Sequence, residues 1–178
     1  LGSQINFKLN DLIGKIPIFA KTERGFRNLT KLSSKSFLEV EASKPPHCNV
    51  EDLLENSDDL IITSGGLDSL FSKLVKKNNT KELEQFSSKI KSIFGDRFYL
   101  EIQRHNDPNE IGFEKFNLKK SLDLEIPIIA TNEVFYLDKE MHEAHDALIC
   151  IGNKTYVNEK NRLRFTDQHY LKTNSEMS

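Results

Sequence analysis

The sequence contains few residues of several types, and the small number of cysteines excludes one class of protein. It has no tryptophan, five prolines and only two cysteines, Cys48 and Cys150, in 178 residues. Two cysteines cannot form the dense disulfide framework of a small secreted scaffold. We therefore expect two reduced thiols and a cytoplasmic setting.

Long apolar runs and a large net charge are also absent. No apolar run approaches the roughly 18 residues of a membrane span, and no signal peptide is visible. The net charge is −2, so no global basic field attracts nucleic acid. Any contact with DNA must be local or made by another part of a larger protein. No GxSxG, P-loop or GxGxxG pattern occurs.

Hydrophobic residues make up 37% of the chain and charged residues 29%, and the length suits one domain with a sizeable core. Short apolar runs alternate with helical patterns along the chain. We expect strands at 4–9, 16–20, 60–63, 98–103 and 126–130, and helices at 23–38, 50–55, 69–77, 81–94, 110–124 and 139–150. This alternation favours a parallel sheet or barrel with helices outside.

Local signals support several of these boundaries. Thr22 and Asn49 have the side chains of helix N-caps, and Gly95 suits the position after a helix end. In the helix 23–38, four apolar residues are expected close to one face: Phe26, Leu29, Leu32 and Phe37.

The stretch 126–153 is the one around which the chain is organised. Its apolar run, Ile126 to Ala130, has the composition of a strand buried on both faces. The following helix offers apolar positions at helical spacing: Ala144, Leu148 and Ile149.

Polar or glycine-rich segments follow three of the expected strands: Ser64-Gly65-Gly66, Gln103-Arg104-His105 and Thr131-Asn132-Glu133. The carboxyl ends of parallel strands are where α/β proteins place their ligand chemistry. We therefore predict that the Gly65, His105 and Glu133 ends share one rim.

His105 and Glu133 form the first candidate site, because imidazole and carboxylate suit zinc or manganese. A catalytic site needs about three protein ligands, and the alternative is that both residues only satisfy exposed backbone.

His142 and His145, three residues apart, are neighbours on a helix surface but do not match HExxH. Ser64-Gly65-Gly66 is compatible with a phosphate cradle or with a tight turn.

Five segments together resemble one family. They are Glu23–Ser34, Leu60–Gly66, Tyr99–His105, Ile128–Leu137 and Ala144–Gly152. In order and spacing they are similar to the PHP (polymerase and histidinol phosphatase) domain family, in the form found at the amino end of the bacterial DNA polymerase III alpha subunit.

The resemblance implies an α/β fold, a distorted (β/α) barrel of PHP type that is incomplete at the amino end. Residues 1–178 would form a single, partial PHP domain, without the first strand–helix units, the His-x-His motif or the downstream polymerase domains. Metal-competent members carry ligands at positions that align with Gln4, Lys15, His105, Glu133 and Phe135. Of these five only His105 keeps the family's residue, which indicates a degenerate metal-site rim, with Ser64, Gly65, Gly66 and His145 as possible neighbours.

The function implied by the resemblance is that of a structural and docking module in a replicative DNA polymerase. The chain itself would hold no polymerase active site, and magnesium would serve the parent polymerase elsewhere. Expected partners are DNA through the parent, a proofreading exonuclease subunit and other replicase subunits, and no membrane. The alternative is an active metal-dependent phosphoesterase or 3′–5′ exonuclease, which would require zinc or manganese.

Overall fold

The computed structural model describes residues 1–77 and 80–177. The chain divides into two compact units, each described by itself below. The first unit comprises Leu1–Ile102 and Gly112–Ile129, and the second comprises Gln103–Ile111 and Ala130–Ser178. None of the helices in the described residues has the length and apolarity needed to cross a bilayer.

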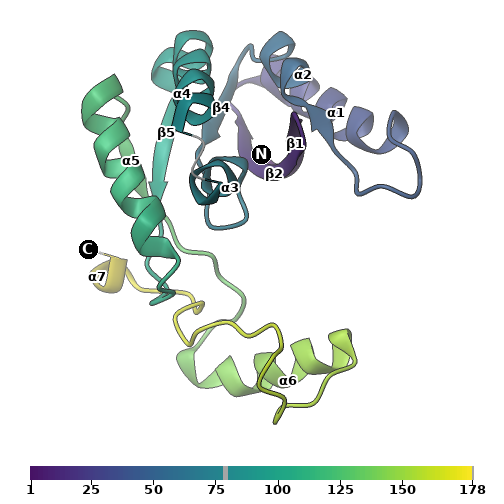
Figure 1. Cartoon of the computed structure of the whole chain (residues 1–178), viewed down its shortest axis with the longest axis vertical. Coiled ribbons are helices and arrows are strands. Elements are labelled where there is room, and N and C mark those ends of the chain that lie inside the picture. The colour runs from purple at the N-terminus through teal and green to yellow at the C-terminus, as the bar shows by residue number, and fades with distance from the viewer. Residues whose placement is uncertain (78–79, 178) are drawn as a thin grey trace. The chain divides into compact units, whose positions relative to one another are not determined.

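The strands are β1 (Gly2–Leu9), β2 (Leu12–Ala20), β3 (Cys48–Asn49), β4 (Leu60–Thr63), β5 (Phe98–Ile102) and β6 (Ile128–Ala130). The α-helices are α1 (Glu23–Leu38), α2 (Val50–Glu55), α3 (Leu70–Lys76), α4 (Thr80–Phe94), α5 (Glu110–Leu124), α6 (His142–Asn153) and α7 (Asn174–Met177). Short 3₁₀ turns cover Gly95–Arg97 and Lys139–Met141. Figure 1 shows this succession of elements along the chain.

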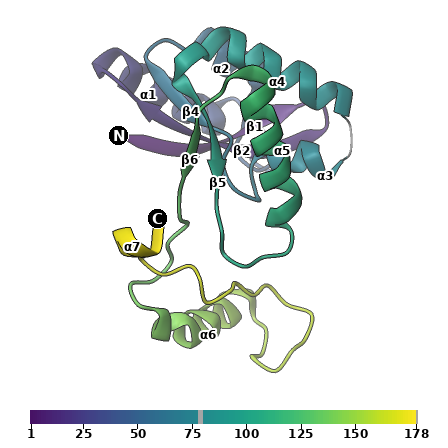
Figure 2. The same cartoon turned by 90° about the vertical axis from the view of Figure 1, so that its left-hand side faces the viewer.

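Within the described residues the strands form one sheet in the order β3-β1-β2-β4-β5-β6; Figure 2 shows β4, β5 and β6 side by side. The predicted α/β class is confirmed. The parallel pairing predicted for 60–63 and 98–103 is also confirmed, since Ile62 lies opposite Phe98 in a parallel ladder.

The parallel direction predicted for the strand at 16–20 is wrong. β2 runs antiparallel to both β1 and β4. Asn10 and Asp11 join β1 to β2 in a two-residue turn, with Asn10 in the left-handed region at φ 52°. A two-residue connection forces the chain to reverse, so β2 is the second strand of a hairpin.

The strand predicted to be central and buried lies at an end of the sheet order. β6 is short, and Ile128 is 37% exposed, although Ile126 just before the strand is buried in the core of the first unit. An end strand has a neighbour on one side only, which explains why its side chains are less covered than those of β4.

The core of the first unit lies between the sheet and its helices. Four phenylalanines are fully buried there: Phe7, Phe71, Phe94 and Phe98. Phe71 packs on Phe98 with ring centroids 5.4 Å apart. This aromatic centre joins the inward faces of β1 and β5 to α3 and α4.

Helix α1 begins where predicted, with the Thr22 hydroxyl accepting a hydrogen bond from the Gly25 amide at 3.3 Å. Its buried stripe, however, is Gly25, Leu29, Leu32 and Ser36. Phe26 and Phe37, which we expected close to one face with Leu29 and Leu32, are 43% and 68% exposed, so they do not belong to the buried stripe. A Cβ on Gly25 would meet the Asp59 carbonyl oxygen at 2.1 Å, and this close approach fixes the rotation of the helix.

Candidate functional site

His105 is the centre of the candidate site, which lies in the second unit. It follows β5 by three residues and is only 2% exposed. Glu110, the first residue of α5, holds it with both carboxylate oxygens. Oε1 lies 2.7 Å from His105 Nδ1, and Oε2 accepts from the His105 backbone amide at 2.8 Å.

The other ring nitrogen of His105 is also engaged. The backbone amide of Glu133 donates to His105 Nε2 at 3.2 Å. His105 and Glu133, which we expected on one rim, are therefore in contact, and this contact is made by the backbone amide of Glu133. An imidazole that accepts at Nε2 must carry its proton on Nδ1, where it donates to Glu110.

His169 is a second histidine at this site. Its ring stacks on that of His105 with centroids 4.0 Å apart and planes 2° apart. Its Nδ1 lies 3.0 Å from the Glu133 carbonyl oxygen, to which it donates. Burial, followed by the proximity of His105, lowers the pKa of His169 from 6.5 to about 4, so this ring is neutral at physiological pH.

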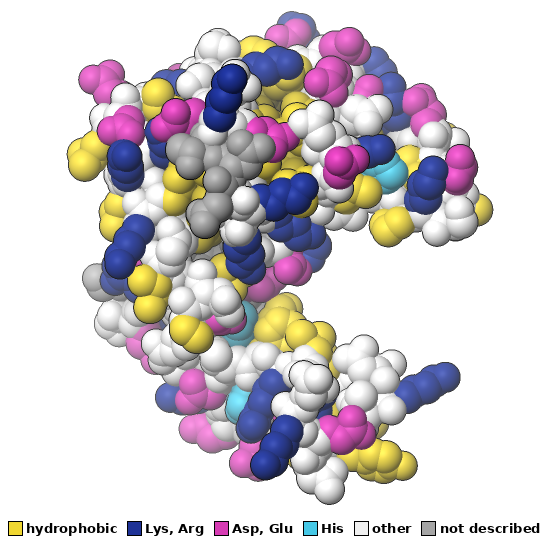
Figure 3. Space-filling view, in the orientation of Figure 1, with side chains coloured by type: hydrophobic (Ala, Val, Ile, Leu, Met, Phe, Trp, Pro, Cys, Tyr) yellow, Lys and Arg dark blue, Asp and Glu magenta, His cyan; other side chains and the backbone are white. Residues whose placement is uncertain are grey.

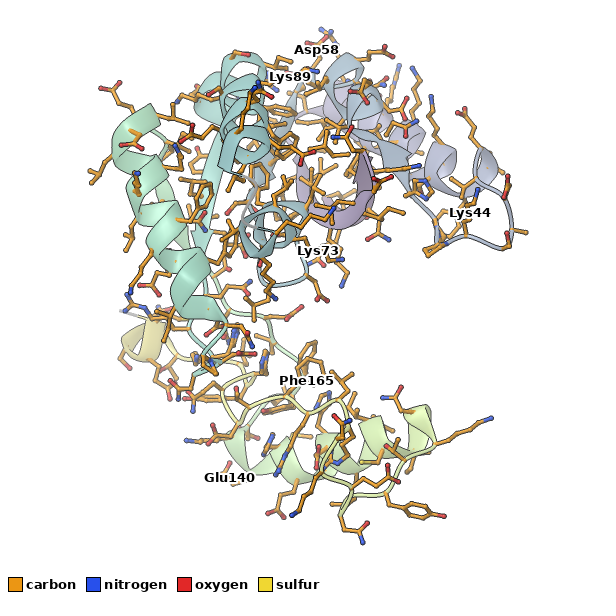
Figure 4. The ribbon with its side chains drawn as sticks, viewed as in Figure 1. Lys44, Asp58, Lys73, Lys89, Glu140 and Phe165 are labelled. Atoms are coloured by element: carbon orange, nitrogen blue, oxygen red, sulfur yellow. The ribbon has the colours of Figure 1, made fainter. Side chains whose placement is uncertain are left out.

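Phe135 extends this cluster of rings. Its ring centroid lies 4.9 Å from that of His169, 5.3 Å from that of His145 and 4.7 Å from that of Phe165. Figure 4 marks Phe165 on the segment that runs beside α6. The Phe135 side chain has no atom that could coordinate a metal ion. Its contacts are with the rings of His169, His145 and Phe165.

The two histidines of α6 have separate roles. His142 Nε2 lies 2.9 Å from the Phe165 carbonyl oxygen and donates to it, which ties the start of the helix to the returning segment. His145 packs among Phe135, Tyr136 and Phe165. His142 therefore anchors the start of the helix by a hydrogen bond, and His145 packs in the cluster of rings.

Helix α6 buries a carboxylate that sequence reasoning did not single out. Arg162 holds Asp146 with two parallel hydrogen bonds of 2.6 Å, and the side chains are 4% and 8% exposed. This hydrogen bonding from Arg162 lowers the pKa of Asp146 although burial opposes it. Arg162 also donates to the Val157 carbonyl at 3.1 Å. The pair therefore fastens the segment after α6 onto the helix.

The apolar positions predicted for α6 are not its buried face. Asp146 and Cys150 are buried, whereas Ala144 is exposed and Leu148 is 63% exposed. The helix also starts three residues later than predicted, because Lys139–Met141 forms a 3₁₀ turn.

Gln4 and Lys15 lie in the first unit on adjacent strands. Gln4 lies opposite Pro17, and Lys15 lies opposite Asn6. Gln4 is exposed, and the ammonium of Lys15 faces the carboxylate of Asp68 at 3.5 Å. Their place in a degenerate metal-site rim stays a prediction.

Ser64, Gly65 and Gly66 lead from β4 into a tight turn at residues 67–68 of the first unit. The buried Ser64 hydroxyl accepts from the Glu101 amide at 2.8 Å. Gly65 has φ +70°, and a Cβ there would lie 2.9 Å from the Ser69 Cβ. The Gly66 carbonyl accepts from the Ser69 amide at 3.0 Å. These contacts favour the tight-turn interpretation, while the rim shared with the other strand ends stays a prediction.

The residues of the site do not fit a catalytic metal ion of the kind that the PHP resemblance implies. The His105 Nε2 lone pair already accepts a hydrogen bond, and Phe135 offers no ligand atom. Among residues 1–77 and 80–177, no three His, Cys, Asp or Glu side chains are grouped so that they could hold a metal ion.

Sequence reasoning missed Glu110, His169, Phe165 and Arg162. Glu110 carried a usable signal, because an acidic residue in the first turn of a helix shortly after His105 is well placed to reach back to it. His169 and Phe165 follow no strand or helix pattern. They reach the site through the return of the chain after α6.

Comparison with known proteins gives a consistent result. The family model described as PHP domain matches residues 1–105. The chain is 35% identical over 177 residues to "DNA polymerase III subunit alpha" of Rickettsia conorii, covering 99% of this chain and 15% of that protein. It is 34% identical over 160 residues to the protein of that name from Caulobacter vibrioides, covering 90% of this chain and 14% of the relative. For Borreliella burgdorferi the identity is 33% over 175 residues, covering 96% of this chain and 15% of the relative. The chain thus spans about one seventh of the length of these relatives.

Proposed function

The chain belongs to the PHP domain family, and on that premise we propose that it forms part of the alpha subunit of a bacterial replicative DNA polymerase. One observation carries this proposal: the chain aligns over 99% of its length with a protein named DNA polymerase III subunit alpha, at 35% identity. An alignment that runs from end to end favours a shared context over the transfer of a short motif.

In this proposal the parent protein adds deoxynucleotides to a primer in chromosome replication. Magnesium held by carboxylates outside the 178 residues would serve that reaction by stabilising the charge on the transferred phosphoryl group. The compartment is the bacterial cytoplasm, and the two free cysteines, Cys48 and Cys150, agree with it.

The PHP segment itself acts as a structural and docking module rather than as a nuclease. Support comes from the second unit, where both ring nitrogens of His105 are engaged and Phe135 packs among other rings. The proposed partners are a separate proofreading exonuclease subunit and other replicase subunits. DNA would be contacted by the parent polymerase.

Primer extension tests the polymerase role. The protein of the complete reading frame should extend a primed template with deoxynucleotides and magnesium, and removal of magnesium should stop the extension. A complete protein that lacks DNA synthesis under these conditions would overturn the proposal.

Co-purification and a nuclease assay test the docking role. We expect the complete protein to bind the exonuclease subunit of its own species at micromolar concentration, and to show no 3′–5′ exonuclease activity in manganese or zinc. Exonuclease activity that disappears in a His105→Ala variant, with DNA synthesis retained, would establish the active-enzyme alternative instead.

A further inference from the structure

The backbone of one residue, Glu133, makes hydrogen bonds to two histidine side chains in the second unit. The amide of Glu133 donates to His105 Nε2 at 3.2 Å, and the carbonyl of the same residue accepts from His169 Nδ1 at 3.0 Å. The two imidazoles stack with centroids 4.0 Å apart. His105 and His169 are 2% and 7% exposed, so these bonds are shielded from water.

The hydrogen bonds define the tautomer of each ring. A backbone N–H can only donate, so Nε2 of His105 must present its lone pair to Glu133. The proton of His105 then lies on Nδ1, against the Glu110 carboxylate at 2.7 Å. A backbone carbonyl can only accept, so His169 carries its proton on Nδ1.

This arrangement contains half of a metal-binding triad. A ligating histidine commonly donates one ring N–H to a carboxylate and uses its other nitrogen for the metal. His105 and Glu110 provide the first interaction, but the second nitrogen of His105 receives the Glu133 amide. A zinc ion would need that lone pair at about 2.0–2.1 Å, so it can bind only if the amide leaves.

We propose that His105 and His169 form a neutral, hydrogen-bonded clamp on the backbone of Glu133, whose amide takes the position that a metal ion would need on His105. The proposal rests on the proposed structural role of this PHP segment and names the side chains that supply it. Glu110 is a positioning residue, because its carboxylate holds the His105 ring in the tautomer that can accept from Glu133.

The clamp joins three stretches that are far apart in the sequence. His105 comes from the segment after β5, Glu133 from the segment after β6, and His169 from the end of the returning chain. Two further bonds follow the same path, from the Phe135 amide to the His169 carbonyl at 2.8 Å and from the Thr166 hydroxyl to the His105 carbonyl at 2.5 Å. A metal ion cross-links segments by coordination, and here hydrogen bonds make the cross-link.

Nuclear magnetic resonance of the unmodified protein tests the clamp directly. In the 178-residue chain with ¹⁵N-labelled histidine at pH 7, we expect His105 and His169 both to be protonated on Nδ1 and unprotonated on Nε2. Protonation of His105 on Nε2, or of both its nitrogens, would overturn the proposal. Because this measurement needs no substitution at the site, a variant that fails to fold cannot obscure it.

Metal titration supplies the second test. We expect calorimetry with zinc or manganese at tens of micromolar to show no stoichiometric binding, and the melting temperature to be the same with and without a chelator. One bound equivalent that is lost in His105→Ala would show that a metal, rather than the clamp, occupies His105.

Alanine substitutions distinguish the effect of losing the clamp from the effect of losing any histidine side chain. His105→Ala and His169→Ala should each lower the melting temperature by several degrees. His47→Ala should leave it unchanged, because His47 lies in a loop, where its ring pairs with the Pro45 carbonyl at 2.7 Å. Equal melting temperatures for all three variants and the unmodified protein would also overturn the clamp. These results are independent of primer extension, so a failed clamp and a failed polymerase role are distinguishable.

Discussion

Asp146 is a carboxylate that the second unit buries beside a guanidinium, and this gives the protein a defined acid sensitivity. Hydrogen bonding from Arg162 lowers the pKa of Asp146 in the folded chain. The pair therefore stabilises the fold fully above the ordinary carboxyl pKa of about 3.9. That contribution disappears as the pH falls through the lower pKa of the folded state. We expect Asp146→Asn to lower the melting temperature at pH 7 and to reduce the further loss of stability below about pH 4.

Asp58 provides the matched control for this prediction. It pairs with Arg24 at the surface, where the side chains are 62% and 67% exposed, and exposed pairs contribute little to stability. Asp58→Asn should therefore leave the melting curve nearly unchanged between pH 3 and pH 7. If Asp146→Asn and Asp58→Asn behave alike at pH 7, the buried pair does not have the structural role assigned to it.

At the residue scale, the sequence predicts which residues lie near one another better than it predicts which of their atoms make the contact. His105 and Glu133 each follow a strand, and that position predicts that they share one rim. The contact uses the backbone amide of Glu133, whose direction depends on the local path of the chain and has no signature in residue type. Arg162 lies 16 residues from Asp146, and such a pairing has no periodicity to reveal it.

At the element scale, the start of α1 is a feature that the sequence specifies. Thr22 accepts from the Gly25 amide at 3.3 Å and donates to the Asp59 carboxylate at 2.9 Å. Loss of an N-cap hydroxyl typically costs about 1 kcal/mol. We expect Thr22→Ala to lower the free energy of unfolding by about that amount, measured by urea denaturation.

Thr30 on the same helix makes a matched comparison. It is exposed, and its hydroxyl bonds back to the Phe26 carbonyl at 2.9 Å without capping either end. Thr30→Ala should change the stability by less than about 0.5 kcal/mol, as exposed substitutions usually do. A larger loss for Thr30→Ala than for Thr22→Ala would refute the assignment of the cap.

Helix α6 shows why periodicity failed for another element. An apolar stripe normally faces the core, but α6 buries Asp146 and leaves Leu148 63% exposed. The buried carboxylate is tolerated because Arg162 pairs with it, and pairing offsets much of the free energy that burying a charge costs. Since that partner arrives from a distant segment, the helix pattern alone pointed to the wrong face.

The direction of β2 was misjudged for a different reason. Asn and Asp at positions 10 and 11 are typical turn residues, but the alternation of strands and helices elsewhere in the chain favours parallel pairing. A two-residue connection permits only an antiparallel neighbour. The turn length therefore carried more information than the general alternation of elements.

At the scale of the whole molecule, the aromatic centre of the first unit should dominate its stability. Phe98 is fully buried and stacks on Phe71. A buried phenylalanine replaced by alanine typically costs about 3–5 kcal/mol, because apolar contacts are lost and a cavity is left. We expect Phe98→Ala to lower the unfolding free energy of the first unit by that amount in denaturant titrations.

Phe37 offers the same side-chain deletion at an exposed position. It is 68% exposed at the end of α1, so Phe37→Ala should change the stability by less than about 0.5 kcal/mol. Similar losses for the two variants would mean that the core does not lie where the buried residues place it. The comparison also decides between the apolar face of α1 read from the sequence and the face seen in the structure.

Charge across the whole chain predicts how the isolated protein treats DNA. The chain has 25 Lys and Arg against 27 Asp and Glu. Figure 3 shows both signs interspersed on the face in view. Affinity for duplex DNA without sequence preference comes from cationic side chains that neutralise phosphates and release counterions. Mixed charge supplies little of this attraction, and we therefore expect other parts of the proposed replicase to contact DNA.

We therefore expect the 178-residue chain to show no saturable binding to a short duplex at about 10 μM protein and physiological salt, where ordinary non-specific sites have dissociation constants of roughly 10⁻⁴–10⁻⁶ M. Fluorescence anisotropy of a labelled duplex measures this, with the protein of the complete reading frame as the positive control. Saturable binding by the short chain that weakens steeply as salt rises would reveal phosphate contacts made by these residues. In that case the PHP segment would itself hold DNA, and its role in the polymerase would extend beyond structure and docking.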